Sequence, residues 1–320
     1  MKRKEPRVTD SEAAGFMYDV DEYVRNPEAA LPALAGFLNA GSLVLGIGAG
    51  ASKGMGLPDW ATLVKRCANE TNRRAGTSLA LPAGTDTRTL GRTMNRVETA
   101  IARKLDMGRS TDYRALVRDC LYQGVTYDND SMLRQGLLIA FGALLVRSRR
   151  GSVREVFNFN FDDVLDWYLA LHGLDTQIVT RVPTLLREAD ITIYHPHGFL
   201  PLDAAKRGES DFLVLSQHSY DDKLGDRVDR WLDLFTTTMT RRVMLFVGLS
   251  GDDQTFYPSL VAAHKLIGRE RYTGFWLLGP DDTQDRIDDL KDRNVVPLRL
   301  ASYDQYPDYL LEICRQALAG

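Results

Sequence analysis

The sequence predicts an α/β fold in which helices cover both faces of a doubly wound, mostly parallel sheet that carries a helical insert. Short, fully apolar runs alternate with helical patterns in the second half of the chain, which is typical of a parallel sheet buried on both faces. A further apolar run, over Ser42–Ile47, ends in a glycine-rich turn. Between these regions, residues 61–150 show helical patterns alone, so we expect them to form an inserted subdomain.

Three units follow along the chain. Helices occupy residues 1–41, where Pro27 and Pro32 interrupt the helical periodicity. The sheet domain takes residues 42–60 and 151–320, and the insert takes residues 61–150. The expected helices of the insert cover Trp60–Ala75, Arg88–Leu105, Asp112–Leu121 and Ser131–Arg147.

After residue 150 the predicted strands and helices alternate. The strands cover Val153–Phe159, Gln177–Val179, Ile191–His195, Phe212–Leu215, Val243–Gly248, Gly274–Leu278 and Val295–Leu298. The helices cover Asp163–Leu171, Gly225–Thr240, Phe256–Ile267, Thr283–Asp292 and Tyr306–Leu318. Ligands of doubly wound sheets bind beyond the carboxyl ends of the strands, so site residues should follow these strands.

Charge and cysteine usage argue against several classes of function. The 40 basic and 43 acidic residues are well mixed, so direct binding to nucleic acid or to a membrane surface is not expected. We interpret the basic run from Arg147 to Arg154 as a solvated helix end, with a nucleic-acid or partner patch as the alternative. Three widely spaced cysteines predict neither a zinc site nor a disulfide framework. No signal peptide or membrane-spanning run is present, which predicts a cytoplasmic protein.

The most informative segment runs from Leu43 to Trp60. Its closely spaced glycines let the backbone adopt positive φ and approach a ligand closely, and their amides can cradle a pyrophosphate. The glycines alone indicate only that a nucleotide binds. The continuation Gly56-Leu57-Pro58-Asp59-Trp60 sets this loop apart from an ordinary dinucleotide fingerprint, which needs neither the proline nor the tryptophan.

Five polar or glycine-rich motifs follow five predicted strands, so they should converge on one edge of the sheet as a nucleotide site requires. These motifs are the glycine loop, Asn158–Asp163, His195–Gly198, Ser216–Tyr220 and Gly248–Asp253.

In this order, the motifs resemble those of the sirtuin superfamily, and most closely its divergent sirtuin-like branch in bacterial antiphage defence. The loop that wraps the NAD diphosphate in sirtuins is matched by Gly48, Ala49, Gly50, Ser52, Gly56, Pro58 and Asp59. The sirtuin Gln-Asn-Ile-Asp motif is similar to Phe159-Asn160-Phe161-Asp162, and the His-Gly pair is similar to His197-Gly198. Gly248-Leu249-Ser250 resembles the late Gly-x-Ser, and Asp253 fits the Gly-x-Ser-x-x-Asp form of the divergent branch.

The resemblance implies a Rossmann-like, NAD-binding sheet domain and a role for each matched residue. Asn160 would orient a catalytic water and His197 would be the catalytic base. Asp162 would hold the nicotinamide carboxamide, and Ser250 would contact phosphate or the adenosine ribose. We expect Trp60 to pack as a lid beside the loop or to stack on a ligand ring.

The departures from sirtuins point away from protein deacylation. The four-cysteine zinc module after the His-Gly is missing, and the sirtuin Asp-Phe-Arg is replaced by Asp59-Trp60-Ala61. The insert stands where sirtuins have the small domain of the acyl-lysine cleft. The resemblance therefore implies an NAD glycohydrolase without zinc or another metal, which uses NAD as its substrate and depletes cellular NAD during infection.

Such an effector must be held inactive in resting cells. We therefore expect a homo-oligomer and a second defence-system protein, such as an ATPase, an argonaute-like protein or a nucleotide-processing subunit.

Other interpretations remain open. The chain could sense NAD or ADP-ribose without turnover, be an NAD-dependent deacylase, or transfer hydride with Glu70 as the ribose-binding acid. Asn160 and Asp162 could cap the following helix. His195, His197 and Asp162 could form a metal site, although we expect His195 to be a core or supporting residue. The remaining histidines, expected to be structural, are His172, His218 and His264.

Overall fold

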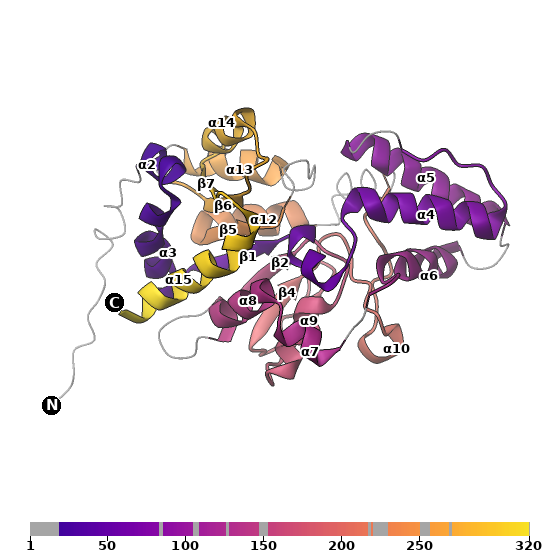
Figure 1. Cartoon of the computed structure of the whole chain (residues 1–320), viewed down its shortest axis with the longest axis horizontal. Coiled ribbons are helices and arrows are strands. Elements are labelled where there is room, and N and C mark those ends of the chain that lie inside the picture. The colour runs from indigo at the N-terminus through magenta and orange to yellow at the C-terminus, as the bar shows by residue number, and fades with distance from the viewer. Residues whose placement is uncertain are drawn as a thin grey trace.

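The computed structural model of the chain describes residues 19–82, 86–104, 109–125, 128–146, 153–216, 219, 230–249, 257–268 and 271–319. A sheet domain forms the larger part, and helices α4, α5 and α6 form a lobe at one side of it (Figure 1). The strands are β1 Leu43–Ile47, β2 Glu155–Asn158, β3 Thr176–Val179, β4 Ile191–Tyr194, β5 Val243–Val247, β6 Gly274–Leu278 and β7 Val295–Arg299. The α-helices are α2 Val20–Arg25, α3 Leu31–Asn39, α4 Trp60–Ala75, α5 Thr87–Lys104, α6 Arg109–Leu121, α7 Asn129–Leu133, α8 Gly136–Val146, α9 Val164–Leu171, α10 Ala204–Arg207, α12 Trp231–Arg241, α13 Tyr257–Ile267, α14 Gln284–Asp292 and α15 Tyr306–Ala319. Short 3₁₀ turns cover Pro27–Ala30, Ala49–Ala51, Lys53–Met55 and Tyr303–Gln305.

The seven described strands form one parallel sheet in the order β3-β4-β2-β1-β5-β6-β7. The central strand β1 pairs with β2 on one side and β5 on the other, so that Leu45 lies beside Val156 and Leu245. The chain therefore runs outward from β1 in one direction and then returns to build the other half. This confirms the predicted doubly wound, Rossmann-like fold and places its topological switch point at β1 and β5.

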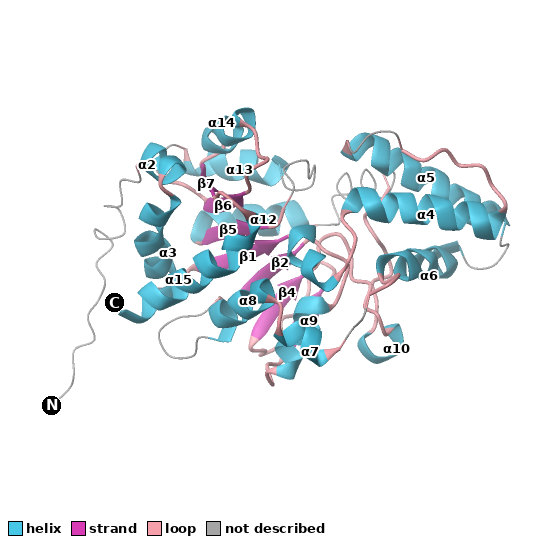
Figure 2. Ribbon diagram, in the orientation of Figure 1, coloured by secondary structure: helices cyan, strands magenta, loops and turns pink. Residues whose placement is uncertain are grey.

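Helices cover both faces of the sheet, as Figure 2 shows. Successive side chains of a strand point to opposite faces. Leu43, Leu45 and Ile47 consequently pack in the core that includes α3, α8 and α15, whereas Val44 packs in the core that includes α12, α13 and α14. This burial on both sides explains why the central strands β1 and β5 are apolar throughout. Among the described helices, none is long and apolar enough to span a bilayer.

The region between β1 and β2 does not pack as one body. Helices α4, α5 and α6 pack on one another and form the lobe, whereas α8 packs against α15 over the sheet (Figure 1). The helix predicted over Ser131–Arg147 is interrupted, because Arg134 and Gln135 lie between α7 and α8.

One predicted strand is wrong. Residues 212–215 are not a strand, although Val214 N donates to the carbonyl of His197 at 2.8 Å. Strand β4 already pairs with β3 and β2 on its two sides, so it has no free edge for another strand. The apolar run instead lies against the segment that leaves the carboxyl end of β4.

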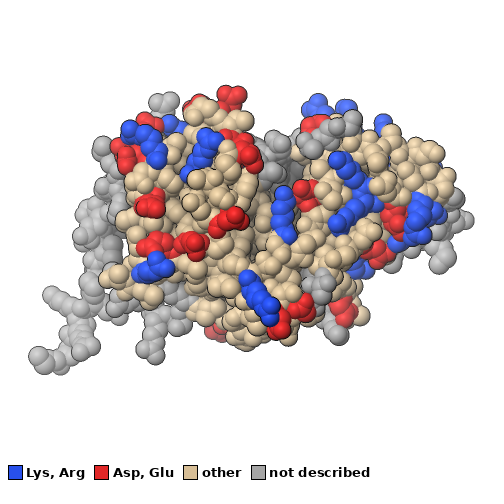
Figure 3. Space-filling model, viewed as in Figure 1, with Lys and Arg blue, Asp and Glu red and all other residues tan. Residues whose placement is uncertain are grey.

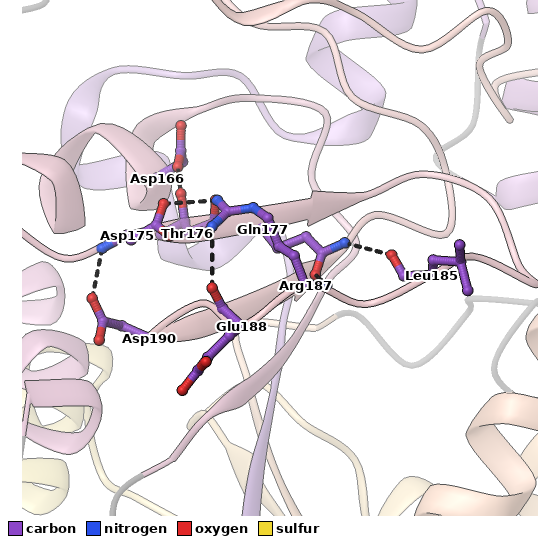
Figure 4. Close-up of polar contacts among 8 residues, drawn as sticks. All are labelled: Asp166, Asp175, Thr176, Gln177, Leu185, Arg187, Glu188 and Asp190. Atoms are coloured by element: carbon purple, nitrogen blue, oxygen red, sulfur yellow. Dashed lines mark hydrogen bonds and ion pairs between the residues drawn. The ribbon is translucent and has the colours of Figure 1, made fainter.

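The segment that follows the edge strand β3 is bound to it through the Gln177 and Arg187 side chains (Figure 4). Gln177 donates to the carbonyl of Leu185 at 3.1 Å and accepts from the amide of Arg187 at 2.9 Å. The Arg187 guanidinium contacts the carboxylate of Asp175 and the carbonyl of Thr176, each at 2.7 Å. These bonds occupy polar groups that an edge strand would otherwise offer to another chain.

Candidate functional site

The glycine loop lies at the switch point of the sheet. It follows β1 directly, and its backbone is bound to the end of β5: Gly48 N donates to Val247 O at 3.1 Å, and Gly50 N donates to Gly248 O at 3.0 Å. Crevices of this kind, beyond the carboxyl ends of two diverging strands, hold the ligands of doubly wound proteins. The structure thus brings together two motifs that lie two hundred residues apart in the sequence.

Side chains at this contact would separate the two loops. A Cβ at Gly48 would lie 2.6 Å from Gly248 O. Gly248 has a φ of +70°, and a Cβ there would lie 2.9 Å from Ala51 N. Both positions therefore require glycine, one for the close approach and the other also for its backbone conformation.

The second half of the loop leads into α4. Gly56 adopts the left-handed conformation, and Asp59 caps the helix by accepting from Thr62 N at 2.9 Å. Trp60 begins α4 and is half-buried, as are Ala49, Gly50 and Pro58. Glu70 lies within α4 and pairs with Arg73 and Arg74, so it does not end a second strand as a hydride-transferring fingerprint would require.

Asn160 ties the segment after β2 to the glycine loop. Its side-chain nitrogen donates to Gly48 O at 2.9 Å and to Ser52 Oγ at 3.3 Å. The side chain is buried, and its amide oxygen is an acceptor that can orient a water. Neither bond goes to a helix terminus, so Asn160 is not a helix cap.

Asp162 lies beside the same serine. Its Oδ1 accepts from Ser52 Oγ at 3.1 Å and from the amide of Val164, the first residue of α9, at 3.2 Å. Asp162 thus makes the capping contact considered from the sequence and also faces the loop. Burial raises the pKa of this carboxyl to about 6, while the hydrogen bonds from Val164 and Ser52 oppose the rise.

Two histidines that follow β4 hold the backbone of the Asn160 segment. His195 contacts Asn160 O through Nδ1 at 2.9 Å, and His197 contacts Phe159 O through Nδ1 at 3.2 Å. Because a carbonyl only accepts, each Nδ1 carries the proton and each Nε2 is the basic nitrogen. The imidazole of His197 is therefore bound to the residue that precedes Asn160 in the chain.

The environments of the two imidazoles differ. His195 is buried, its Nε2 has no hydrogen-bond partner among the described residues, and burial lowers its pKa to about 4. His197 is half-buried, with its ring edge-on to Phe159 at 5.4 Å between centroids. His195 is thus a neutral support, whereas His197 is the imidazole that a ligand can reach. Across the described residues, no group of three or more His, Cys, Asp or Glu side chains is placed to hold a metal.

Sequence reasoning missed a set of contacts from α6. The hydroxyl of Tyr122, just beyond the helix, lies 3.0 Å from Asp163 Oδ1 and 2.9 Å from Leu200 O, and its one proton is shared between these two acceptors. Arg118 donates to Pro201 O at 3.1 Å, and Arg114 donates to Asp211 O at 2.9 Å. The spacing of four residues, which places all three side chains on one helix face, was the available signal.

The loop that these side chains hold begins at Gly198, next to His197. Gly198 has a φ of +104°, and a Cβ there would lie 2.5 Å from Phe212 O. The turn therefore requires glycine at position 198. The backbone conformation thus explains why a glycine follows His197. Of the remaining predicted site residues, Ser250 and Asp253 lie outside the described part of the chain, as does His218.

Residues 154–298 match a family model described as a SIR2-like domain. This match, over somewhat less than half of the chain, supports a sirtuin-like superfamily member. The matched span of this SIR2-like chain contains Asn160, Asp162, His197 and Gly248, and the glycine loop precedes it. SIR2-like domains bind NAD, so the match indicates an NAD-related function and is consistent with an NAD-using enzyme. A search of the curated proteins found no match.

Proposed function

We propose that this SIR2-like protein is an NAD glycohydrolase that converts NAD and water into ADP-ribose and nicotinamide. The observation that carries the proposal is that His197 binds the carbonyl of Phe159, the residue next to Asn160, while Asn160 binds Gly48 O in the glycine loop. A diphosphate held in that loop would leave the rest of the dinucleotide to extend toward these two side chains.

The chemistry that we propose needs a leaving group, a nucleophile and a base. The bond between ribose C1′ and the nicotinamide nitrogen breaks, and its electron pair goes to that nitrogen. A water held by Asn160 Oδ1 forms the new bond to C1′, and its proton passes to Nε2 of His197. The Asp162 carboxyl binds the carboxamide of the departing nicotinamide. General acid–base catalysis of this kind contributes about 10²–10⁴-fold, and positioning by the rigid loop supplies more.

We further propose that the protein consumes the cytoplasmic NAD pool as an antiphage effector. Its resemblance to the divergent, zinc-free branch of the superfamily supports this role. NAD consumption must be prevented in resting cells, so we propose control by homo-oligomerisation or by a second defence protein. An ATPase, an argonaute-like protein or a nucleotide-processing subunit could serve as that protein.

The proposal predicts that His197→Ala loses activity. Nicotinamide release from NAD by the purified protein should fall about 10²–10⁴-fold. His172→Ala is the matched control, because His172 is exposed at the end of α9 and its Nδ1 contacts only the local Tyr168 carbonyl among the bonds described. If wild type releases nicotinamide and His197→Ala releases it at the same rate, the proposal is overturned.

The same comparison should be made inside cells, because an effector awaiting its trigger is inactive when isolated. NAD should fall in infected or overexpressing cells that carry wild type and stay constant with His197→Ala. Adding an acyl-lysine peptide to the purified protein tests deacylation, and binding of NAD without nicotinamide release in triggered cells would identify a sensor.

A further inference from the structure

The helical lobe has a basic charge that the whole-chain balance conceals. Residues 60–125 contain twelve Lys and Arg against six Asp and Glu, whereas the complete chain has 40 against 43. In the view of Figure 3, several basic side chains lie over the lobe with acidic ones among them, and the opposite end of the molecule carries side chains of both signs. The lobe therefore has an excess of basic residues that the whole-chain count does not show.

An open groove of about 520 Å³ lies between α5 and the segment that follows α4. Its polar lining comes from Thr77, Asn95, Arg96, Thr99 and Arg103, and the lining includes neither a carboxylate nor an aromatic ring. Asn72 fixes one wall, because it accepts from Thr77 Oγ1 at 2.8 Å and from Leu79 N at 2.7 Å and donates to Leu79 O at 3.0 Å. These hydrogen bonds hold Thr77 and Leu79, which line the groove, in place against α4.

The arginines of α5 differ from the other arginines of the lobe. Arg73 and Arg74 pair with Glu70, and Arg114 and Arg118 pair with Glu209. In contrast, Arg92, Arg96 and Arg103 are exposed, and no ion pair involves them within the described residues. Guanidinium groups without an internal partner are available to an external anion.

These three arginines form a ridge along α5. Steps of four and seven residues keep them on one side of the helix, and from Arg92 to Arg103 the helix rises roughly 16 Å. The ridge is longer than the phosphate group of a single nucleotide. It can instead contact several successive phosphates of a nucleic-acid strand. Without an aromatic ring in the groove, bases have no side chain on which to stack.

We propose that the groove and the arginine ridge of α5 bind a strand of nucleic acid through its phosphodiester backbone, without preference for base sequence. The guanidinium groups of Arg96 and Arg103 contact phosphate oxygens inside the groove, and Asn95 and Thr99 offer further polar contacts. Arg92 extends the contact along the ridge. This site is separate from the NAD site and does not depend on its activity.

Fluorescence anisotropy of a labelled oligonucleotide of roughly 20 residues tests the proposal with the full chain. At about 50 mM salt, single-stranded DNA should bind wild type, and its affinity should fall as salt is raised. The double variant Arg96→Glu/Arg103→Glu should bind about tenfold more weakly or worse. The slope of log binding constant against log salt concentration should become shallower by about two. Two oligonucleotides of different sequence should bind equally.

The matched control is Lys65→Glu/Arg73→Glu, which changes the net charge of the lobe equally at exposed positions of α4. Circular dichroism should show all variants folded, and control affinity should stay within about twofold of wild type. Equal weakening by both double variants would overturn the assignment to this groove, as would absence of binding by wild type. Complete displacement by ATP at the same phosphate concentration would instead identify a small-nucleotide site and would also overturn the proposal.

Discussion

Asp162 and His195 are two buried titratable groups that respond to pH in opposite directions. Burial raises the pKa of Asp162 to about 6 and lowers the pKa of His195 to about 4. From about pH 4 to pH 6 the folded state therefore holds extra protons at Asp162, while the unfolded state holds extra protons at His195. Rising pH destabilises the fold through the carboxyl and stabilises it through the imidazole, so the two effects offset each other in wild type.

Asp162→Asn should separate these effects. Asparagine can accept the bonds from Ser52 and Val164 and carries no charge. The free energy of unfolding of the variant, relative to wild type, should rise by about 3 kcal/mol between about pH 4 and pH 7. Urea unfolding of both proteins across this range measures the difference, and a difference independent of pH would contradict the raised pKa.

At the scale of elements, α6 links the helical lobe to the loop that follows His197. Tyr122, Arg118 and Arg114 bind backbone carbonyls between residues 200 and 211, and Tyr122 also binds Asp163 at the start of α9. The lobe is therefore connected to both segments that carry the proposed catalytic residues. A movement of α6 would therefore displace the segments that carry Asn160 and His197.

Tyr122→Phe should weaken this link. The change removes the one hydroxyl proton that two buried acceptors share, so the free energy of unfolding should fall by about 1–3 kcal/mol. Nicotinamide release should fall as well, because the loop beside His197 loses a support. The measurements are the urea midpoint and the nicotinamide assay.

Tyr113→Phe on the same helix is the control. The Tyr113 hydroxyl is buried with no hydrogen-bond partner among the described residues, so its removal should leave stability unchanged or slightly higher. If both phenylalanine variants lose the same stability and activity, the hydrogen bonds of Tyr122 are not the cause.

At the scale of the whole molecule, the candidate NAD site joins the two halves of the sheet. The loop after β1 contacts Gly248 after β5 on one side and Asn160 after β2 on the other. A dinucleotide bound there would bridge both halves and stabilise the folded chain as a unit.

NAD should therefore raise the melting temperature of the His197→Ala variant, which does not consume its ligand. At a hundredfold excess over Kd the stabilisation amounts to about 2.7 kcal/mol. Gly248→Ala, introduced in the same background, should abolish the shift, because a Cβ there meets the glycine loop. Differential scanning fluorimetry measures both, and equal shifts in the two proteins would place NAD elsewhere.

Local patterns sufficed to predict much of this protein. Short runs rich in apolar residues predicted each of the seven strands, and the pattern was clearest in β1, β5 and β6, which are buried along their whole length. The order of the glycine loop, Asn160, Asp162 and His197-Gly198 along the chain indicated the superfamily before any spatial information. The extra strand at residues 212–215 was an error of the same reasoning, since an apolar run does not reveal whether a neighbouring strand still has a free edge.

The elements, the parallel sheet and the residues at the ends of its strands can be inferred from the chain alone, because they follow from periodicity and from local backbone chemistry. Which of those residues meet becomes visible only in the folded molecule. The hydrogen bond from Gly50 to Gly248 and the support of the Asn160 segment by His195 and His197 join residues remote in the chain. Such contacts arise from packing in three dimensions, where distance along the chain carries no information about distance in space.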